Sequence, residues 1–198
     1  MKRLALIFFC LSAFAAASPD EGPCVVPGRG HFRIHTDTSG VFGAFGHDHL
    51  VEAKTIQGCA VIDRNNFARS SIKLTFPTKD IRVVDPKVDA KERAKVQEAM
   101  ETEVLHVSRY PQVVFESTSV EGSASASTLR IHGNLTIHGK TQSIILPVNL
   151  TRLDDGTYRA SGEYSFKQTS FGIRPVKLAG GTVKVKDEVR TEFELYLK

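Results

Sequence analysis

The sequence lacks the short motifs that mark several common classes of enzyme. It contains three cysteines in 198 residues and no CxxC pair, so thiol redox catalysis has little support. It also contains no G-x-S-x-G nucleophile turn and no P-loop, which are the usual signs of a serine hydrolase and of a nucleotide-binding enzyme. We therefore expect no enzymatic activity.

A strong excess of one charge sign is also missing. The chain has 26 basic and 22 acidic residues, a formal net charge of +4. Without Lys2 and Arg3 the excess falls to +2, because 24 basic residues then face 22 acidic ones. The basic residues are spread evenly along the chain, so nucleic acid is not an expected partner.

Long apolar runs are confined to the beginning of the chain. A basic M-K-R start is followed by the apolar residues 4–14 and then by three alanines. This order is typical of a cleaved signal peptide over residues 1–17, and it predicts a periplasmic or secreted protein. No later stretch is long and apolar enough to cross a membrane, so we expect no transmembrane segment after signal cleavage.

Cys24 and Cys59 are the two cysteines that would remain after cleavage. In an oxidising compartment such a pair is typical of a disulfide, which would tie the N-terminal arm to the rest of the fold. Two free or buried thiols are the alternative. Residues 18–30 are rich in Pro and Gly and predict a leader. The remaining residues, 31–198, suit one domain with a sizeable core.

Apolar and polar residues alternate strictly on both sides of Gly139. Strict period two predicts two strands with one buried face each, and the glycine favours a tight turn between them. Two registers keep both apolar sets on the same side. A two-residue loop would place Ile131 opposite Leu146, and a four-residue loop would place Leu135 opposite Ile144.

The same alternation recurs along most of the chain. Further strands are expected at residues 31–36, 47–53, 55–63, 71–76, 110–118, 158–166 and 183–197. Long amphipathic strands that follow one another in sequence favour a closed antiparallel barrel of about eight strands, because closure removes exposed sheet edges. The expected fold class is therefore all-β. Such a barrel can be filled by its own side chains or can hold one ligand, and the pattern leaves both possibilities open.

One segment interrupts the strand pattern. Asp89 and Glu92 resemble a helix capping box, and the residues after them are good helix formers. Val96, Met100 and Val104 recur at i, i+4 and i+8, which predicts one apolar stripe. We expect one amphipathic helix over residues 89–105, with this stripe against the sheet.

Four segments in chain order resemble one known family. They are SRYPQVVFESTSVE, LTIHGKTQSIILPV, SFKQTSFGI and GGTVKVKDEVRTEFEL. Over residues 31–198 the chain resembles the YceI-like, polyisoprenoid-binding family. The resemblance implies an extended, lipocalin-like antiparallel barrel that is exported and holds a long isoprenoid chain without catalysis. It also implies a homodimer in at least some members.

Strand parity predicts which apolar residues would form the wall of a lumen. The candidates are Phe32, Ile34, Phe76, Phe115, Leu135, Ile137, Leu146, Phe166, Phe193 and Leu195. Ordinary core packing is the alternative for each of them. The expected ligand is a polyisoprenoid or an isoprenoid-quinone-like amphiphile. Its affinity would come from apolar area removed from water, at about 25 cal/mol per Å².

The segment GAFGHDHLVEA departs from the commoner family pattern, which has a lone histidine. His47 and His49 share one strand face, and Asp48 lies on the other. Two such histidines can chelate Zn²⁺ or Cu²⁺ if a third ligand is present, or they can bind a polar head group. A hydrogen-bonded pair near the barrel rim is the third interpretation. The alternative function is therefore a periplasmic metal or redox accessory protein with a metal ion as cofactor.

Overall fold

The structure is a computed structural model that describes residues 22–39, 49–123, 128–178 and 183–198. The strands are β1 (Val25–Ser39), β2 (His49–Ala53), β3 (Gln57–Val61), β4 (Ser71–Pro77), β5 (Ile81–Val83), β6 (Gln112–Glu121), β7 (Leu129–Ile137), β8 (Lys140–Arg152), β9 (Tyr158–Lys167), β10 (Lys177–Leu178) and β11 (Val183–Leu197). The helices are η2 (Phe67–Arg69), η3 (Thr78–Asp80), α1 (Ala90–Ala99), η4 (Met100–Val104) and η5 (Gln168–Phe171).

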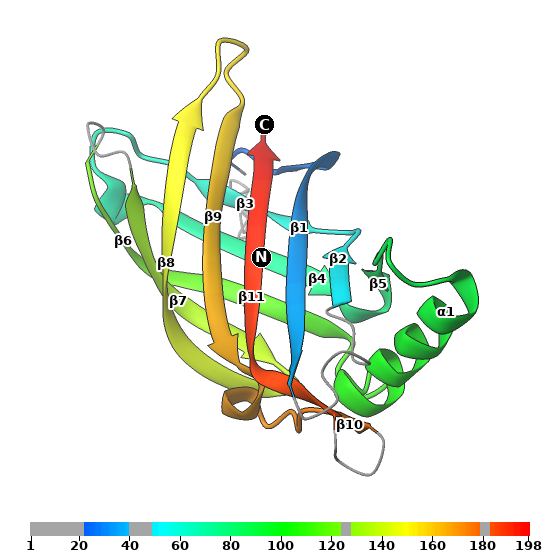
Figure 1. Ribbon diagram of the computed structural model, residues 1–198. Coiled ribbons are helices and arrows are strands. Elements are labelled where there is room, and N and C mark those ends of the chain that lie inside the picture. Colours follow the sequence, from blue (N-terminus) through cyan, green and yellow to red (C-terminus); the bar gives the residue numbers. More distant parts are fainter. Residues whose placement is uncertain (1–21, 40–48, 124–127, 179–182) are drawn as a thin grey trace, which may run out of the picture.

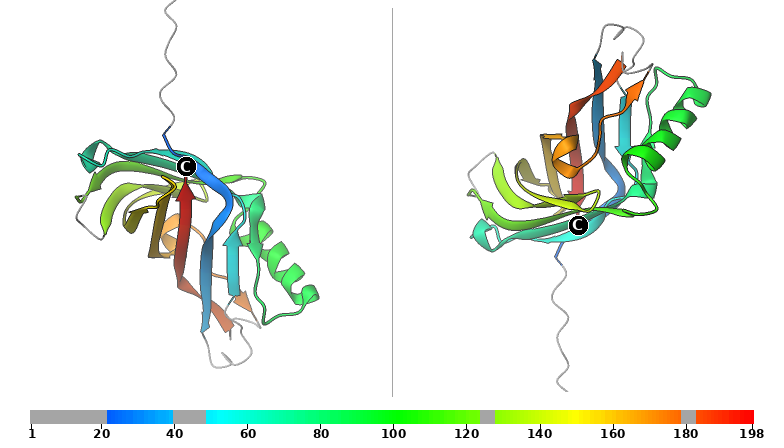
Figure 2. Two further views of the ribbon diagram at one scale, coloured as in Figure 1. Left: turned by 90° about the horizontal axis from the view of Figure 1, so that it is seen from above. Right: turned by 90° about the horizontal axis from the view of Figure 1, so that it is seen from below.

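The strands form one rolled antiparallel sheet (Figure 1). Their order is β3-β4-β6-β7-β8-β9-β11-β1-β2-β5, and β10 pairs with β11. Strand β8 pairs with β7 along residues 140–148 and with β9 along residues 149–152. The sheet turns over on itself at this strand, so that its two halves face each other across the interior (Figure 2). The predicted all-β, lipocalin-like barrel fold is confirmed.

The β7–β8 hairpin has a two-residue turn. His138 and Gly139 have φ values of 53° and 72°, the left-handed backbone that favours a type I′ turn. Ile131 lies opposite Leu146, as the two-residue alternative predicts, and the four-residue alternative is wrong. The apolar residues of both strands consequently face the interior.

The rolled sheet is not closed by a strand ladder. Among the residues that the structure describes, β3 and β5 end the strand order and do not pair with each other. The Ala60 N–H of β3 donates to the Pro23 carbonyl at 2.9 Å, and Cys59 of β3 forms an isolated β-bridge with Cys24. The expectation of a fully closed barrel therefore needs correction. We call the open boundary along β3 the seam, and the residues just before β1 bridge it.

Helix α1 covers the free edge of β5. The side-chain oxygen of Gln97 accepts from the Val83 N–H at 2.8 Å, and its amide nitrogen donates to the Ile81 carbonyl at 2.9 Å. These two bonds replace part of the ladder that a neighbouring strand would provide. An edge that is covered in this way is protected from pairing with other chains.

The predicted helix has its expected beginning and packing. The Asp89 carboxylate accepts from the Glu92 N–H at 2.8 Å, which satisfies one of the unpaired donors of the first turn. Val96 and Met100 pack against the main core cluster, as the apolar stripe predicts. The last turn, Met100–Val104, is π-helical.

Some predictions differ from the structure in their limits or lie outside the described residues. Strand β1 begins at Val25, so residues 25–30 of the predicted leader belong to a strand. The sequence pattern does not predict β5 and β10, because three and two residues are too few to show a period. The predicted signal peptide, residues 1–17, and His47 lie outside the described residues. Among the described helices, none has the length and apolar character of a membrane span.

Candidate ligand cavity

An apolar cavity of about 190 Å³ lies in the part of the interior that the helix end covers. All ten residues that strand parity predicts for a lumen wall line this cavity. Parity within strands could not identify the wall residues that come from η4 and from the turn after it. Met100, Val104 and Leu105 line the cavity from there. Contact of any of these side chains with a ligand stays a prediction.

The cavity occupies only part of the interior. Two clusters of buried side chains fill the remainder. They are Ala60, Val148, Ala160 and Leu197, and Phe67, Val120 and Leu129. None of these seven residues lines the cavity. The sequence leaves open whether the interior is filled or hollow, and the structure combines a solid core with a hollow region beside the helix end.

Two inward-facing glycines position aromatic wall residues. A Cβ atom added to Gly133 would lie 2.6 Å from the Phe115 ring, and one added to Gly162 would lie 2.9 Å from the Phe193 ring. Both contacts are closer than van der Waals packing allows, so the rings lie where a larger residue would stand. Gly133 and Gly162 therefore make room for the rings of Phe115 and Phe193, and these rings fill the space beside the glycines.

Polar side chains in the wall bond to the backbone. The Gln168 amide nitrogen donates to the Lys186 carbonyl, and the Thr191 hydroxyl donates to the Tyr164 carbonyl, both at 2.9 Å. Burial raises the pKa of the Tyr164 hydroxyl above its ordinary value, which keeps that group neutral. A single water needs roughly 10–15 Å³ but also two to four polar partners. A cavity with this wall therefore suits an apolar guest better than water.

His49, at the start of β2, pairs with a buried carboxylate. Its Nδ1 atom lies 3.3 Å from an Asp85 carboxylate oxygen, and Asp85 is 1% exposed. The other Asp85 oxygen accepts from the Lys87 N–H at 2.9 Å. Among the described residues, no group of three His, Cys, Asp or Glu side chains is placed to hold a metal ion. His47 lies outside the described residues, so the structure places His49 alone of the two candidate histidines.

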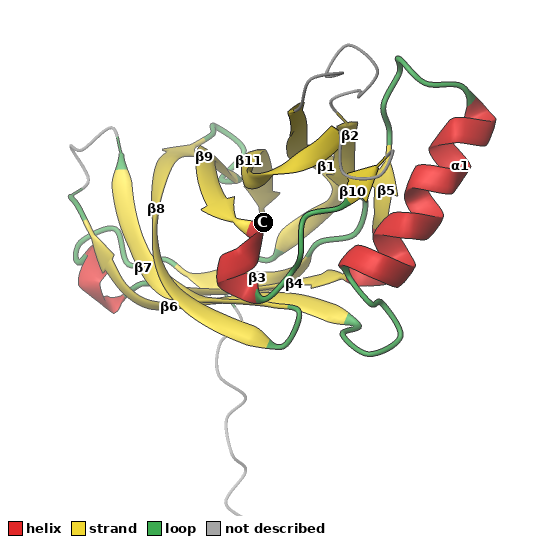
Figure 3. Ribbon diagram, turned by 60° about the horizontal axis from the view of Figure 1, so that its bottom comes forward, coloured by secondary structure: helices red, strands yellow, loops and turns green. Residues whose placement is uncertain are grey.

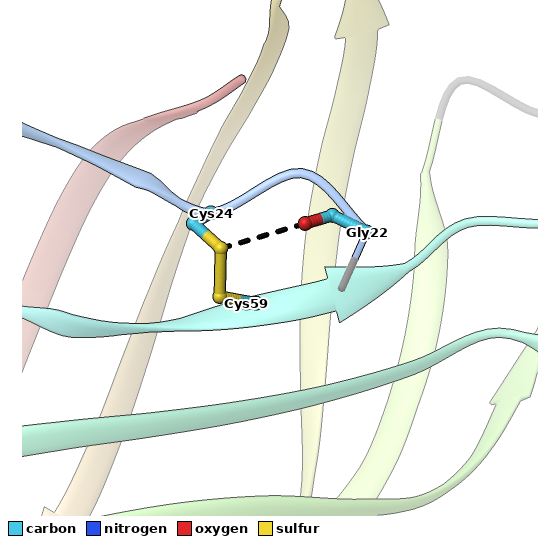
Figure 4. The surroundings of a disulfide bond; sticks show 3 residues. All are labelled: Gly22, Cys24 and Cys59. Carbon is cyan, nitrogen blue, oxygen red and sulfur yellow. Dashed lines mark hydrogen bonds between the residues drawn. A yellow bond between two sulfur atoms is a disulfide. The ribbon is translucent and has the colours of Figure 1, made fainter. Parts of the chain in front are cut away.

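The structure joins Cys24 and Cys59 by a disulfide that crosses the seam of the sheet (Figure 4). Cys24 precedes β1, and Cys59 lies in β3. The backbone of Cys24 also pairs with Lys198, through N–H to carbonyl bonds of 2.9 and 2.8 Å in the two directions. The first described residues, β3 and the chain end are thus tied together at one place.

Comparison with known proteins assigns this arrangement to a family. The family model described as a YceI-like domain matches residues 29–197, which include the rolled sheet except residues 25–28 of β1. The chain belongs to the YceI-like family. The resemblance carried by the four sequence segments is confirmed by this match.

YceI-like relatives share modest sequence identity with the chain. The UPF0312 protein of Pseudomonas aeruginosa is 29% identical over 149 residues, which cover 72% of this chain and 69% of the relative. Protein YceI of Salmonella newport is 27% identical over 158 residues, which cover 79% of this chain and 68% of the relative.

Solved structures of similar fold have lower identity. BcnA of Burkholderia cenocepacia superposes with a TM-score of 0.68 at 18% identity and covers 88% of this chain and 99% of its own. A polyisoprenoid-binding domain from Saccharophagus degradans superposes with a TM-score of 0.64 at 9% identity and covers 90% of this chain and 98% of its own. At these identities the likeness establishes the common YceI-like fold.

Proposed function

We propose that this YceI-like protein is an exported, non-enzymatic carrier that holds the hydrocarbon chain of an isoprenoid amphiphile. The apolar cavity carries the proposal, because every wall residue predicted for a lipid lumen lines it. The similar fold from Saccharophagus degradans is described as a polyisoprenoid-binding domain, which supports the same class of ligand here. Export rests on the signal-peptide pattern of residues 1–17. A polyisoprenoid or an isoprenoid quinone fits this proposal, and the homodimer stays a prediction.

The wall suits a chain that has no hydrogen-bonding groups. Phe32 lies with its ring centroid 4.9 Å from that of Phe76 and 5.9 Å from that of Phe193. Aromatic rings at these separations attract one another and hold part of the wall in place before a ligand arrives. A preformed apolar wall lowers the cost of ordering on binding. The affinity for a hydrocarbon tail would then follow the apolar area that the tail buries.

A series of prenols of increasing length is expected to bind with rising affinity until the cavity is full. Each methylene that is buried contributes about 0.8 kcal/mol, or about fourfold in affinity, and longer tails should add little beyond that point. Isothermal titration calorimetry gives the affinities. Native mass spectrometry of protein purified without detergent should in addition detect a bound isoprenoid lipid. Protein that is repeatedly recovered empty and binds no prenol would contradict the carrier function.

The second candidate is a metal or redox accessory function that uses His49. The buried Asp85 carboxylate beside Nδ1 favours this function. A histidine that binds a metal through one ring nitrogen commonly donates the N–H of the other to a carboxylate. We expect, on this candidate, stoichiometric Zn²⁺ or Cu²⁺ binding that His49→Ala abolishes while prenol binding is retained. His132→Ala, which removes a histidine that pairs with Glu121 at 2.9 Å, is the matched control. Calorimetry that finds no metal bound to the unaltered protein would exclude the candidate.

A further inference from the structure

Two histidine rings meet at the helix end of the cavity. The His138 ring centroid lies 5.0 Å from that of His106 and 4.2 Å from that of Tyr110. His138 belongs to the β7–β8 turn, and His106 and Tyr110 belong to the turn between η4 and β6; both turns lie at the same end of the sheet (Figure 3). Among the described residues, His106 and His138 are the two non-glycine residues with positive φ, at 47° and 53°. Such backbone strain is common at binding sites.

The charges around His138 have one sign. Burial, followed by the charges of His106, Arg109 and Lys140, lowers the pKa of His138, and a hydrogen bond with the Phe171 backbone opposes this shift. No carboxylate of the described residues contributes to the shift. Within the described chain, neither Arg109 nor Lys140 takes part in an ion pair. Four basic side chains therefore gather without a counter-charge from the described residues.

The hydrogen bonding of the His138 ring is incomplete among the described residues. Its Nε2 atom is buried and makes no hydrogen bond within the described part of the chain. Buried polar atoms are nearly always bonded, so an unsatisfied one calls for an explanation. The Arg109 guanidinium lies 5.3 Å from the Tyr110 ring centroid, which places a planar, permanently charged donor beside the two imidazoles. An anion with several oxygen atoms would supply the missing counter-charge.

This group of side chains adjoins the apolar wall. Leu105 and Ile137 line the cavity, and each directly precedes one of the two histidines. Phe171 packs in one cluster with Ile137. On both turns, the residue that precedes the histidine therefore lines the apolar cavity.

We propose that His106, Arg109, His138 and Lys140 form a binding site for an anionic group of the phosphate type beside the cavity. Arg presents a planar fork that matches phosphate oxygens, and Lys provides a compact charge. The anion is either the head group of an amphiphile, in which case the site rests on the proposed carrier function, or a free phosphate ion. The same side chains would hold both.

The test compares farnesyl phosphate, farnesol and inorganic phosphate by calorimetry, and follows the imidazole signals of His106 and His138 by NMR. We expect the unaltered protein to bind farnesyl phosphate about tenfold or more tightly than farnesol, since hydrogen bonds between charged groups are the stronger kind. The double variant Arg109→Gln, Lys140→Gln should lose this preference and keep its farnesol affinity. The matched control is Arg64→Gln, Lys91→Gln, which removes two exposed basic side chains elsewhere and should keep the preference.

The outcomes separate the site from the carrier function. Binding of inorganic phosphate that shifts both histidine signals, and is lost in the double variant, supports the site even if farnesol fails to bind. Equal affinity for farnesyl phosphate and farnesol, with no response to inorganic phosphate, overturns the site and leaves the carrier function standing. Equal losses in the double variant and in the control also overturn it, because general charge would then explain the preference.

Protonation of His138 should strengthen the site. The lowered pKa of His138 keeps its ring neutral at pH 7. Charge is gained only as the pH falls below the ordinary histidine value of about 6.5. Sulfate keeps its charge over this range, so its affinity is expected to rise between about pH 8 and pH 5. The rise should be smaller in His138→Gln, and a sulfate affinity that does not change with pH in the unaltered protein would overturn the role of His138.

Discussion

Reduction of the Cys24–Cys59 disulfide is expected to lower the free energy of unfolding by about 4 kcal/mol. The bond closes a segment of 35 residues, and the loss of chain entropy in the unfolded state gives roughly this value for a loop of that length. The bond also spans the seam at which no strand ladder closes the sheet. Guanidinium unfolding with and without a reductant, followed by circular dichroism, measures the difference.

The variant Cys24→Ser, Cys59→Ser is the control for this prediction. It should unfold at the midpoint of the reduced protein, and the reductant should have no effect on it. An unfolding midpoint of the unaltered protein that is the same with and without reductant would contradict the prediction. The seam would then be held by its hydrogen bonds and its apolar packing.

Ala53→Phe is expected to weaken prenol binding strongly. Ala53 lies in β2, is 6% exposed and forms part of the cavity wall, so a phenyl ring at this position would take up space that the tail needs. A loss of about four buried methylenes would lower the affinity at least about a hundredfold. The added ring costs roughly 1–3 kcal/mol of stability through overpacking, so circular dichroism must accompany the binding measurement.

A bulky residue on the outer face provides the control. Thr141 is exposed at the start of β8, and Thr141→Phe should leave prenol affinity unchanged. If folded Ala53→Phe protein bound prenols as tightly as the unaltered chain, the lipid would be held outside this cavity. The carrier function would then need a different site.

The interior wall could be predicted from sequence because strand residues alternate between two faces. One buried face fixes which side chains point inward, and a shift of one residue would reverse them all. Ile131 opposite Leu146 and the placement of Phe193 and Leu195 at the cavity follow from this rule alone. The rule applies only inside strands, so it could not show that Leu105, which follows η4, lines the cavity.

The polar contacts could not be predicted, since they join residues from separate segments. Asp85 lies between β5 and α1, and its carboxylate contacts the ring of His49 in β2. No sequence period connects the two positions. His106 and His138 meet because two turns come together at one end of the sheet. The Gln97 amide likewise binds the β5 edge through tertiary packing. A helix pattern predicts that such a residue is exposed, and only the fold gives it a partner.

The position of β11 in the sheet has a consequence for the order of assembly. This last strand of the chain lies between β9 and β1, and β1 is the first strand. Until the C-terminal residues are in place, β9 and β1 each present an unpaired edge to the surroundings. Pairing of the two chain ends closes a long loop, which slows folding. We infer that folding completes late and that a chain shortened by its last strand would aggregate.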